Sequence, residues 1–277
     1  EGSLKLTERI EDKVVRILLV SSSIDFKYIC GKIGPAQPRP ESQMYERAVD
    51  ELRRELEQLQ PDEGLSLINK EFGSSSKFSS ALGMEDQILT HWIGRGNLAI
   101  QIFTLDTGRL FQETYDLLDL TMKKYNLSIQ VFFPDHQQVE AMILQKGINS
   151  FYDSVENRKA CCHIRKVEPL NRALQNTKVW ITGIRADQSL NRKKMEMVEW
   201  DEHYQVIKYN PLINWSQNEV ENYIQTHRIP VSPLHKQGFA SIGCAPCTRA
   251  ILSGEDIRAG RWWWENPEHK ECGLHKK

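Results

Sequence analysis

The sequence predicts an α/β fold, in which a mainly parallel sheet is flanked by helices. Apolar segments that have the length and composition of strands lie at 98–105, 128–133 and 178–182. Amphipathic helical patterns at 111–125 and 137–146 lie between them. Alternation of this kind is typical of βαβ units, which build a parallel sheet. With 277 residues and 40% apolar content, the chain can also bury a full core.

The N-terminal segment 1–60 is expected to be an extension of unknown role with one amphipathic helix. From Glu41 onwards apolar residues recur at three- and four-residue steps, and Pro61 ends the pattern. The earlier apolar run Val14–Val20 is interrupted by Arg16, and a membrane span takes about 20 apolar residues. The run is therefore too short and too polar to span a membrane, and we expect a soluble protein. We also expect an α/β domain at 61–260 and a mobile tail at 261–277.

Three predicted strands end in polar, loop-forming segments. A small strand reaches Lys77–Ser80 and turns through Ala81–Gly83 into a helix that begins at Met84. Backbone N–H groups and a helix dipole can hold a phosphate in such a turn, although an ordinary strand-to-helix connection fits it equally well. The other two strand ends are followed by 106–109 and 183–189. Ligands of parallel sheets sit beyond the carboxyl ends of the strands, so these loops should converge on one crevice.

The charge balance excludes a global attraction to polyanions. Thirty-six basic and thirty-seven acidic side chains give a formal net charge of −1. We therefore expect no nucleic-acid partner and no membrane partner, and any anion binding must be local. No signal peptide is recognisable, and the chain is not a small disulfide-dense scaffold, so its six cysteines indicate a reduced, cytoplasmic compartment. The oligomeric state is left open, a homo-oligomer included.

Four of the cysteines form two close pairs. Cys161 and Cys162 are adjacent, and Cys244 and Cys247 form a Cys-x-x-Cys motif. Cys-x-x-Cys is the usual half of a structural zinc site, but zinc modules normally repeat that spacing. Adjacent cysteines point their side chains apart, which suits the separate corners of an iron–sulfur cluster better. The spacing favours a cluster and leaves zinc open, while the unpaired Cys30 is expected to be inert.

The remaining cysteine, Cys272, lies near the C-terminus. Lys270 precedes it and His275 follows it, and these cations favour the nucleophilic thiolate. The spacing alone leaves a reactive thiol and an ordinary one equally open. The tryptophans at 262–264 are expected to anchor this tail to the core rather than to stack on bases.

Several motifs together resemble the assimilatory adenylyl-sulfate reductases of the phosphoadenylyl-sulfate reductase family. They are FSSALGMED at 78–86, LDTGRLFQETY at 105–115, CCHIRKVEPL at 161–170, TGIRADQS at 182–189, GCAPCTR at 243–249, GRWWWE at 260–265 and ECGLH at 271–275. The likeness runs in order from about Leu65 to Lys277. It implies an adenine-nucleotide α-hydrolase-like fold of the PP-loop type, related to the Rossmann arrangement.

The resemblance also implies a reaction and its residues. Cys272 would attack the sulfur of adenylyl sulfate, expel AMP and form a cysteine S-sulfonate, from which thioredoxin or glutaredoxin releases sulfite. His275 and Lys166 would assist, and Cys161, Cys162, Cys244 and Cys247 would hold a [4Fe–4S] cluster. The implied substrate-binding residues are Ser79, Ser80, Gly83, Glu85, Leu105, Asp106, Thr107, Gly108, Arg109, Gly183, Arg185, Asp187, Arg192, Arg258 and Arg261.

Substrate choice follows from the same likeness. Reductases of the 3′-phosphorylated nucleotide generally lack the four cluster cysteines and have Tyr where this chain has Arg109, so adenylyl sulfate is favoured. The alternatives are a cluster-containing reductase that uses 3′-phosphoadenylyl sulfate or both nucleotides, and a PP-loop tRNA thiolation enzyme. Against the last stands Ser79–Gly83, which lacks the glycine pair of the Ser-Gly-Gly-x-Asp-Ser turn. A non-enzymatic zinc module would leave the converging strand-end loops unexplained.

Overall fold

The computed structural model of the chain describes residues 40–189 and 192–266. Six strands in these ranges form one sheet in the order β3-β2-β1-β4-β6-β5. Its neighbours pair in parallel except for β5, which runs antiparallel to β6 at one edge. The strands are β1 (Ser76–Ser79), β2 (Gln101–Leu105), β3 (Ile129–Phe132), β4 (Val179–Thr182), β5 (Val198–Asp201) and β6 (Val206–Tyr209). The predicted α/β class with a mainly parallel sheet is confirmed.

The strand order reverses next to β1. The chain builds β2 and β3 on one side of β1 and then returns to place β4 on its other side. A parallel sheet has its ligand crevice at such a switch point, beyond the carboxyl ends of the strands. The turns that follow β1 and β4 therefore stand at the position where a ligand is expected.

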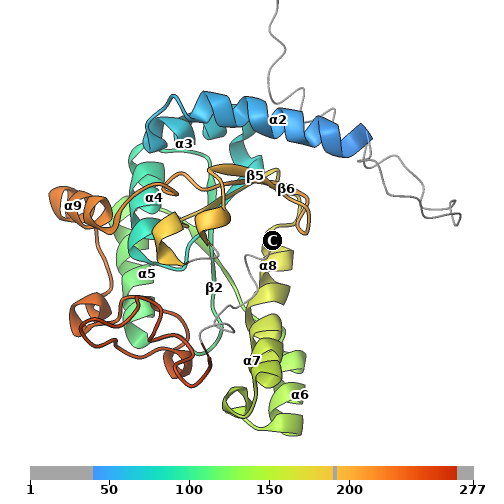
Figure 1. Cartoon of the computed structure of the whole chain (residues 1–277), viewed down its shortest axis with the longest axis vertical. Coiled ribbons are helices and arrows are strands. Elements are labelled where there is room, and N and C mark those ends of the chain that lie inside the picture. Colours follow the sequence, from blue (N-terminus) through green and yellow to red (C-terminus); the bar gives the residue numbers. More distant parts are fainter. Residues whose placement is uncertain (1–39, 190–191, 267–277) are drawn as a thin grey trace, which may run out of the picture.

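Helices cover both faces of the sheet (Figure 1). The α-helices in the described residues are α2 (Pro40–Leu56), α3 (Pro61–Phe72), α4 (Met84–Arg95), α5 (Gln112–Tyr125), α6 (His136–Lys146), α7 (Val155–Cys162), α8 (Glu168–Ala173) and α9 (Gln217–His227). The main core joins α2, α3, α4 and α9 to the strands, for example through Leu52, Ile68 and Phe78, each fully buried. A second cluster packs Leu170 of α8 against Trp180 on the other face.

Local sequence signals explain several helix boundaries. Helix α3 has Pro61 at its first position, where the missing N–H costs nothing. Helix α9 is capped by Ser216, whose backbone N–H donates to the Glu219 carboxylate at 2.7 Å in a capping box. None of the described helices is both long enough and apolar enough to cross a membrane.

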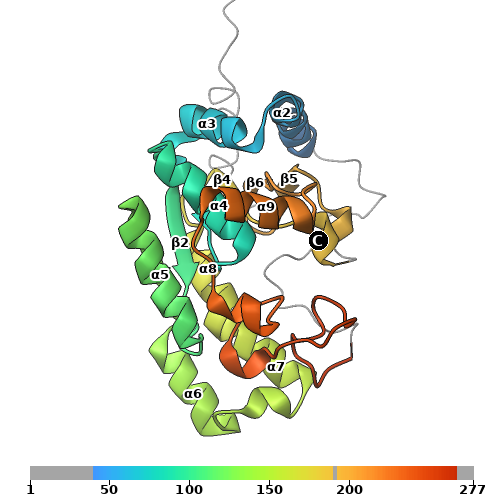
Figure 2. The same ribbon diagram turned by 90° about the vertical axis from the view of Figure 1, so that its left-hand side faces the viewer.

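The adjacent cysteines lie in a long helical segment, in which two α-helices are joined by a short helical turn of another type. Figure 1 shows α7 and α8 end to end, with α6 beside α7. A π-helical turn at His163–Val167 joins the two, and such turns are frequent at functional sites. The C-terminal part of the described chain, red in Figure 2, lies next to α7 beyond the carboxyl end of β2. Residues 1–39, 190–191 and 267–277, which include Cys30, Cys272, His275 and the apolar run Val14–Val20, lie outside the described residues.

Candidate functional site

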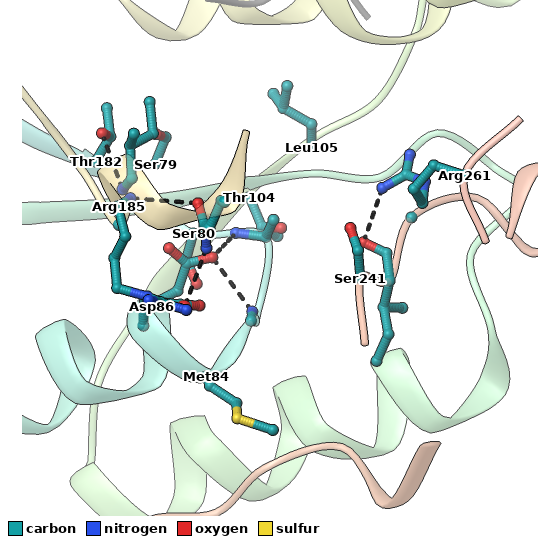
Figure 3. Close-up of a pocket in the computed structure, with 18 of the residues that line it drawn as sticks. Ser79, Ser80, Met84, Asp86, Thr104, Leu105, Thr182, Arg185, Ser241 and Arg261 are labelled. Carbon is teal, nitrogen blue, oxygen red and sulfur yellow. Dashed lines mark hydrogen bonds and ion pairs between the residues drawn. The ribbon is translucent and has the colours of Figure 1, made fainter. Parts of the chain in front are cut away.

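A cavity of about 280 Å³ lies at the switch point of the sheet. Its walls come from the turns after β1, β2 and β4, from 240–243 and from 257–262 (Figure 3). The predicted site residues that line it are Ser79, Ser80, Gly83, Glu85, Leu105, Thr107, Lys166, Gly183, Arg185, Arg192, Arg258 and Arg261. The prediction that the strand-end loops converge on one crevice agrees with this arrangement.

The turn between β1 and α4 is held by a carboxylate from the first turn of α4. Asp86 Oδ2 accepts the backbone N–H of Ala81 at 2.7 Å and that of Gly83 at 3.2 Å. Leu82 between them has φ 61°, and its N–H donates to Ser80 Oγ at 3.2 Å. Burial and the neighbouring Glu85 raise the pKa of Asp86 to about 7, because both oppose its ionised form.

The loop after β4 contributes a buried arginine. Arg185 is 1% exposed, and its Nε donates to Glu85 Oε1 at 2.7 Å while Nη1 donates to the Trp215 carbonyl at 3.1 Å. Gln188 Nε2 donates to the same Glu85 oxygen at 3.0 Å. The predicted substrate residues Glu85 and Arg185 are therefore paired with each other beneath the cavity, and they fix the two turns relative to one another.

Four of the predicted substrate residues do not line the cavity. Asp106 instead accepts the Gly108 N–H at 2.7 Å and the Tyr115 hydroxyl at 2.9 Å. The Arg109 guanidinium donates to the Ile148 carbonyl at 2.6 Å. Asp187 has an exposed side chain at the rim of the β4 loop. In this structure these groups, Gly108 included, shape the neighbouring loops, and their contact with substrate stays a prediction.

The four paired cysteines come together beside the cavity. Cys161 and Cys162 end α7, and Cys244 and Cys247 flank a short helical turn; all four pack with Trp262 in one cluster. Cys244 Sγ lies 3.2 Å from the hydroxyl of Thr107, a cavity residue. Two segments that lie about 80 residues apart in the chain are thus brought together at one end of the cavity.

Basic side chains surround the cysteine cluster. Burial would raise the pKa of Cys244, but Lys166, the Thr107 hydroxyl and nearby arginines outweigh it and lower that pKa. Burial raises the pKa of Cys247 to about 12. Arg165, which is buried, donates to the Thr107 carbonyl at 2.6 Å and interacts with Cys161.

Four thiols that come together are a donor set that suits an iron–sulfur cluster. A polynuclear cluster has its ligands farther apart than a single ion does and carries negative charge through its thiolates. The surrounding cations Lys166, Arg158 and Arg165 would offset that charge. Four converging thiols with adjacent donors are therefore a suitable ligand set.

The predicted anchoring of the tail by the tryptophans is visible in part. Trp262 is 1% exposed and lies between the guanidinium groups of Arg158 and Arg261, each 4.7 Å from its ring. Trp263 is 40% exposed. Trp262 thus holds the chain against the cysteine cluster, four residues before the last described residue, Asn266.

Sequence reasoning missed several cavity residues. Asp86 is the last residue of the motif at 78–86 but was not assigned a role, and Gln188, Gln217 and His235 also line the cavity. An acidic residue at the third position of a helix is a familiar capping signal, so Asp86 could have been found. The segment Ser241–Gly243 reaches the cavity through tertiary folding alone, and no local signal marks it.

Fold and site define an α/β protein with a ligand cavity at the switch point and a thiol-rich centre beside it. A family model described as "Phosphoadenosine phosphosulfate reductase domain" matches residues 76–250. Two similar proteins, both named adenosine 5′-phosphosulfate reductase, come from Allochromatium vinosum and Burkholderia cepacia. The first is 52% identical over 200 residues, covering 72% of this chain and 78% of that protein. The second is 50% identical over 199 residues, covering 72% and 80%.

The chain therefore belongs to the phosphoadenosine phosphosulfate reductase family, among the adenosine 5′-phosphosulfate reductases. The resemblance inferred from the motifs and the enzyme class, an oxidoreductase acting on a sulfur group, are confirmed at this level. A solved phosphoadenylyl-sulfate reductase from Candida auris superposes with a TM-score of 0.63 at 24% identity, covering 80% of this chain and 100% of that one. This likeness confirms the predicted fold.

Proposed function

We propose that the protein reduces adenylyl sulfate to sulfite and AMP, with Cys272 as the nucleophile, in assimilatory sulfate reduction. The observation that carries the proposal is a cavity at the sheet's switch point with Lys166, Arg258 and Arg261 in its lining, next to the four paired cysteines. Cations in that position suit an anionic phosphosulfate. Membership of the adenosine 5′-phosphosulfate reductases supports the same substrate.

In the first step the Cys272 thiolate attacks the sulfur of adenylyl sulfate. A bond forms between the two sulfur atoms, and the bond from that sulfur to the bridging phosphate oxygen breaks. Its electron pair leaves with AMP, and Cys272 becomes an S-sulfonate. Lys166, Arg258 and Arg261 would hold the phosphosulfate oxygens and offset the charge that develops on AMP. Arg192, which the resemblance also assigns to the substrate, donates to Gln188 and acts electrostatically on Asp86, so it would contact the nucleotide on that side of the cavity. His275 would favour the thiolate form of Cys272.

In the second step an external dithiol protein supplies two electrons. Its thiolate attacks the Cys272 sulfur, the sulfur–sulfur bond to the sulfonate breaks, and sulfite leaves with the electron pair. A second thiol of the partner then resolves the mixed disulfide and regenerates the Cys272 thiolate. Thioredoxin or glutaredoxin has the chemistry for this role. Cys272 lies six positions after Asn266, a distance that an extended chain covers in at most about 20 Å.

Cys161, Cys162, Cys244 and Cys247 would hold a [4Fe–4S] cluster. When bound, the cluster would supply a fixed electrostatic field at the phosphosulfate end of the cavity. Lys166 lowers the pKa of Cys244 and also lines the cavity, so its charge acts on both sites. The protein's own contribution would be to hold this lysine next to both the thiols and the cavity, on the π-helical turn after α7.

Mass spectrometry of anaerobically purified protein tests the proposal directly. The protein is mixed with adenylyl sulfate in the absence of reductant, and one sulfonate should appear on Cys272. The variant Cys272→Ser should form no adduct and release no sulfite with thioredoxin. The matched control Cys30→Ser, which removes the other unpaired cysteine, should behave as the wild type. Undiminished sulfite release by Cys272→Ser would refute the proposed reaction.

A further inference from the structure

The acidic and basic residues of the cavity lining are unevenly distributed. The lining contains only two acidic residues among the described residues, Glu85 and Asp86, and both belong to the first turn of α4. Figure 3 shows Asp86 and Arg185 on one side of the cavity and Arg261 on the other. The side near Arg261 also carries Lys166 and Arg258, with no acidic residue in the lining there. One end of the cavity therefore suits an anion, and the other does not.

The anion site of the β1–α4 turn is already occupied by the protein itself. The N–H groups of Ala81 and Gly83, which could hold a phosphate at the start of a helix, both donate to Asp86 Oδ2 at 2.7 and 3.2 Å. The same carboxylate approaches the β4 turn so closely that a Cβ on Gly183 would lie 2.2 Å from Asp86 Oδ1. A phosphate placed here would find the N–H groups of Ala81 and Gly83 already bonded and would meet a carboxylate.

The neighbouring charges leave no surplus of positive charge at this end. Arg185 is held by Glu85 at 2.7 Å and by the Trp215 carbonyl at 3.1 Å. Arg192 donates to Gln188 and acts electrostatically on Asp86. Two guanidinium groups thus face two carboxylates. A carboxylate accepts a hydrogen bond from a hydroxyl readily, whereas it repels a phosphate dianion.

We propose that Asp86 makes the cavity selective for an adenine nucleotide with free ribose hydroxyls, because its carboxylate fills the turn and rejects a phosphate at the nucleoside end. This inference rests on the proposed function for the identity of the nucleotide. It makes Asp86 the specificity residue that separates adenylyl sulfate from 3′-phosphoadenylyl sulfate. Glu85 supports it indirectly by keeping Arg185 away from any such phosphate.

The inference predicts a pH-dependent selectivity. The pKa of Asp86 is raised to about 7, chiefly by burial, with Glu85 adding to the rise and Arg192 opposing it. Arg185 pairs with Glu85 and also lies 3.9 Å from the Asp187 carboxylate, and His235 interacts electrostatically with Glu85. Rejection of the second phosphate should therefore strengthen as pH rises through 7 and weaken below it. A phosphate monoester also loses its last proton near pH 6, so a variant without the carboxylate is needed to isolate the effect of Asp86.

Equilibrium binding of AMP and of adenosine 3′,5′-bisphosphate to the cluster-loaded full chain tests the inference without turnover. The wild type should prefer AMP by about tenfold or more, the cost of one like-charge contact near a protein surface. Asp86→Asn keeps an oxygen to accept the turn's N–H groups and removes the charge, so the preference should fall about tenfold and keep only the pH dependence of the phosphate itself. Asp62→Asn, an exposed carboxylate in the first turn of α3, is the matched control and should leave the ratio unchanged.

The outcomes separate this inference from the proposed function. An equal preference for AMP in Asp86→Asn and the wild type would overturn the inference, as would a wild type with no preference. A loss of affinity for both nucleotides in equal measure would show a structural role only and would also overturn it. A wild type that discriminates in binding but forms no sulfite would refute the proposed reaction and leave the role of Asp86 standing.

Discussion

The ion pair between Arg158 and Glu265 fixes the C-terminal segment to the helix that carries Cys161 and Cys162. Arg158 Nε donates to Glu265 Oε1 at 2.9 Å, and Nη2 donates to Oε2 at 2.7 Å. The two side chains are 1% and 2% exposed. Glu265 lies one residue before the last described residue and seven before Cys272. Breaking this pair should therefore loosen both the fold around the cysteines and the start of the tail.

The magnitude follows from burial. In Glu265→Ala the buried guanidinium of Arg158 loses its carboxylate partner, and breaking a buried pair typically costs 3 to 5 kcal/mol, or about 4 kcal/mol here. For a chain of this size each kcal/mol lowers Tm by about 2–4 °C, so a fall of roughly 10 °C is expected. Glu255→Ala is the matched control, because Glu255 also makes a two-point contact with Arg249 but the side chains are 30% and 37% exposed. Its loss should cost about 1 kcal/mol.

Urea unfolding of the anaerobic, cluster-loaded protein measures both free energies. Arg158→Ala and the double variant complete a mutant cycle, and the double variant should be less destabilised than the sum of the two single changes. Cluster content, followed by visible absorbance, should fall in Glu265→Ala and stay unchanged in Glu255→Ala. Equal destabilisation by Glu265→Ala and Glu255→Ala, or strict additivity in the cycle, would refute the assigned role of the pair.

Two further predictions concern a buried histidine and a close backbone approach. His91 is 5% exposed, and burial, with His227 and Arg95 adding to it, lowers its pKa to about 4. Its neutral form is therefore favoured by folding, so its contribution to stability is intact above about pH 6.5 and is lost as pH falls towards 4. His91→Gln should flatten the stability profile in that range by urea unfolding, and parallel profiles would contradict the assignment. In Gly243→Ala the new Cβ would lie 2.3 to 2.8 Å from the Arg261 guanidinium and displace it. AMP affinity should fall about tenfold with little change in Tm, as expected for the loss of a charge-assisted hydrogen bond, and unchanged affinity would contradict a binding role for Arg261.

The local sequence pattern predicted those helices and strands in which apolar residues recur at regular spacing and bury one face. The expected strands 98–105 and 178–182 and the helices 111–125 and 137–146 agree with β2, β4, α5 and α6 to within a few residues. The strands β5 and β6 were not predicted. In β6 the central Lys208 interrupts the apolar pattern, yet it is buried, because it pairs with Glu199 of β5 at 3.3 Å and lies over the Trp180 ring at 5.3 Å. A partner on another strand is not visible in local sequence.

The same difference between local sequence pattern and tertiary contacts applies to the residues of the site. The family resemblance implied a role at the substrate site for Lys166, Arg258 and Arg261, and all three line the cavity, although their contact with substrate stays a prediction. The resemblance also suggested substrate contact for Arg109, whose guanidinium instead binds the carbonyl of Ile148 and lies 4.9 Å from the Phe151 ring. That contact spans about 40 residues and depends on how the segment after α6 folds back. Motif position fixes where a backbone lies, while the direction of a long side chain depends on tertiary neighbours.

The distribution of carboxylates explains how a chain of net charge −1 can hold a highly charged anion. At the nucleoside end, Asp86 is used to cap backbone N–H groups and Glu85 to hold Arg185. At the cysteine end, Glu265 is withdrawn from the cavity by Arg158. These carboxylates are thus paired with other groups of the protein in the absence of substrate. The electrostatic field in the cavity therefore depends on the end at which each carboxylate lies. The double variant Asp86→Asn, Glu265→Ala should change AMP affinity more than the removal of an exposed carboxylate does. An equally small change would show that this local field is not the basis of nucleotide binding.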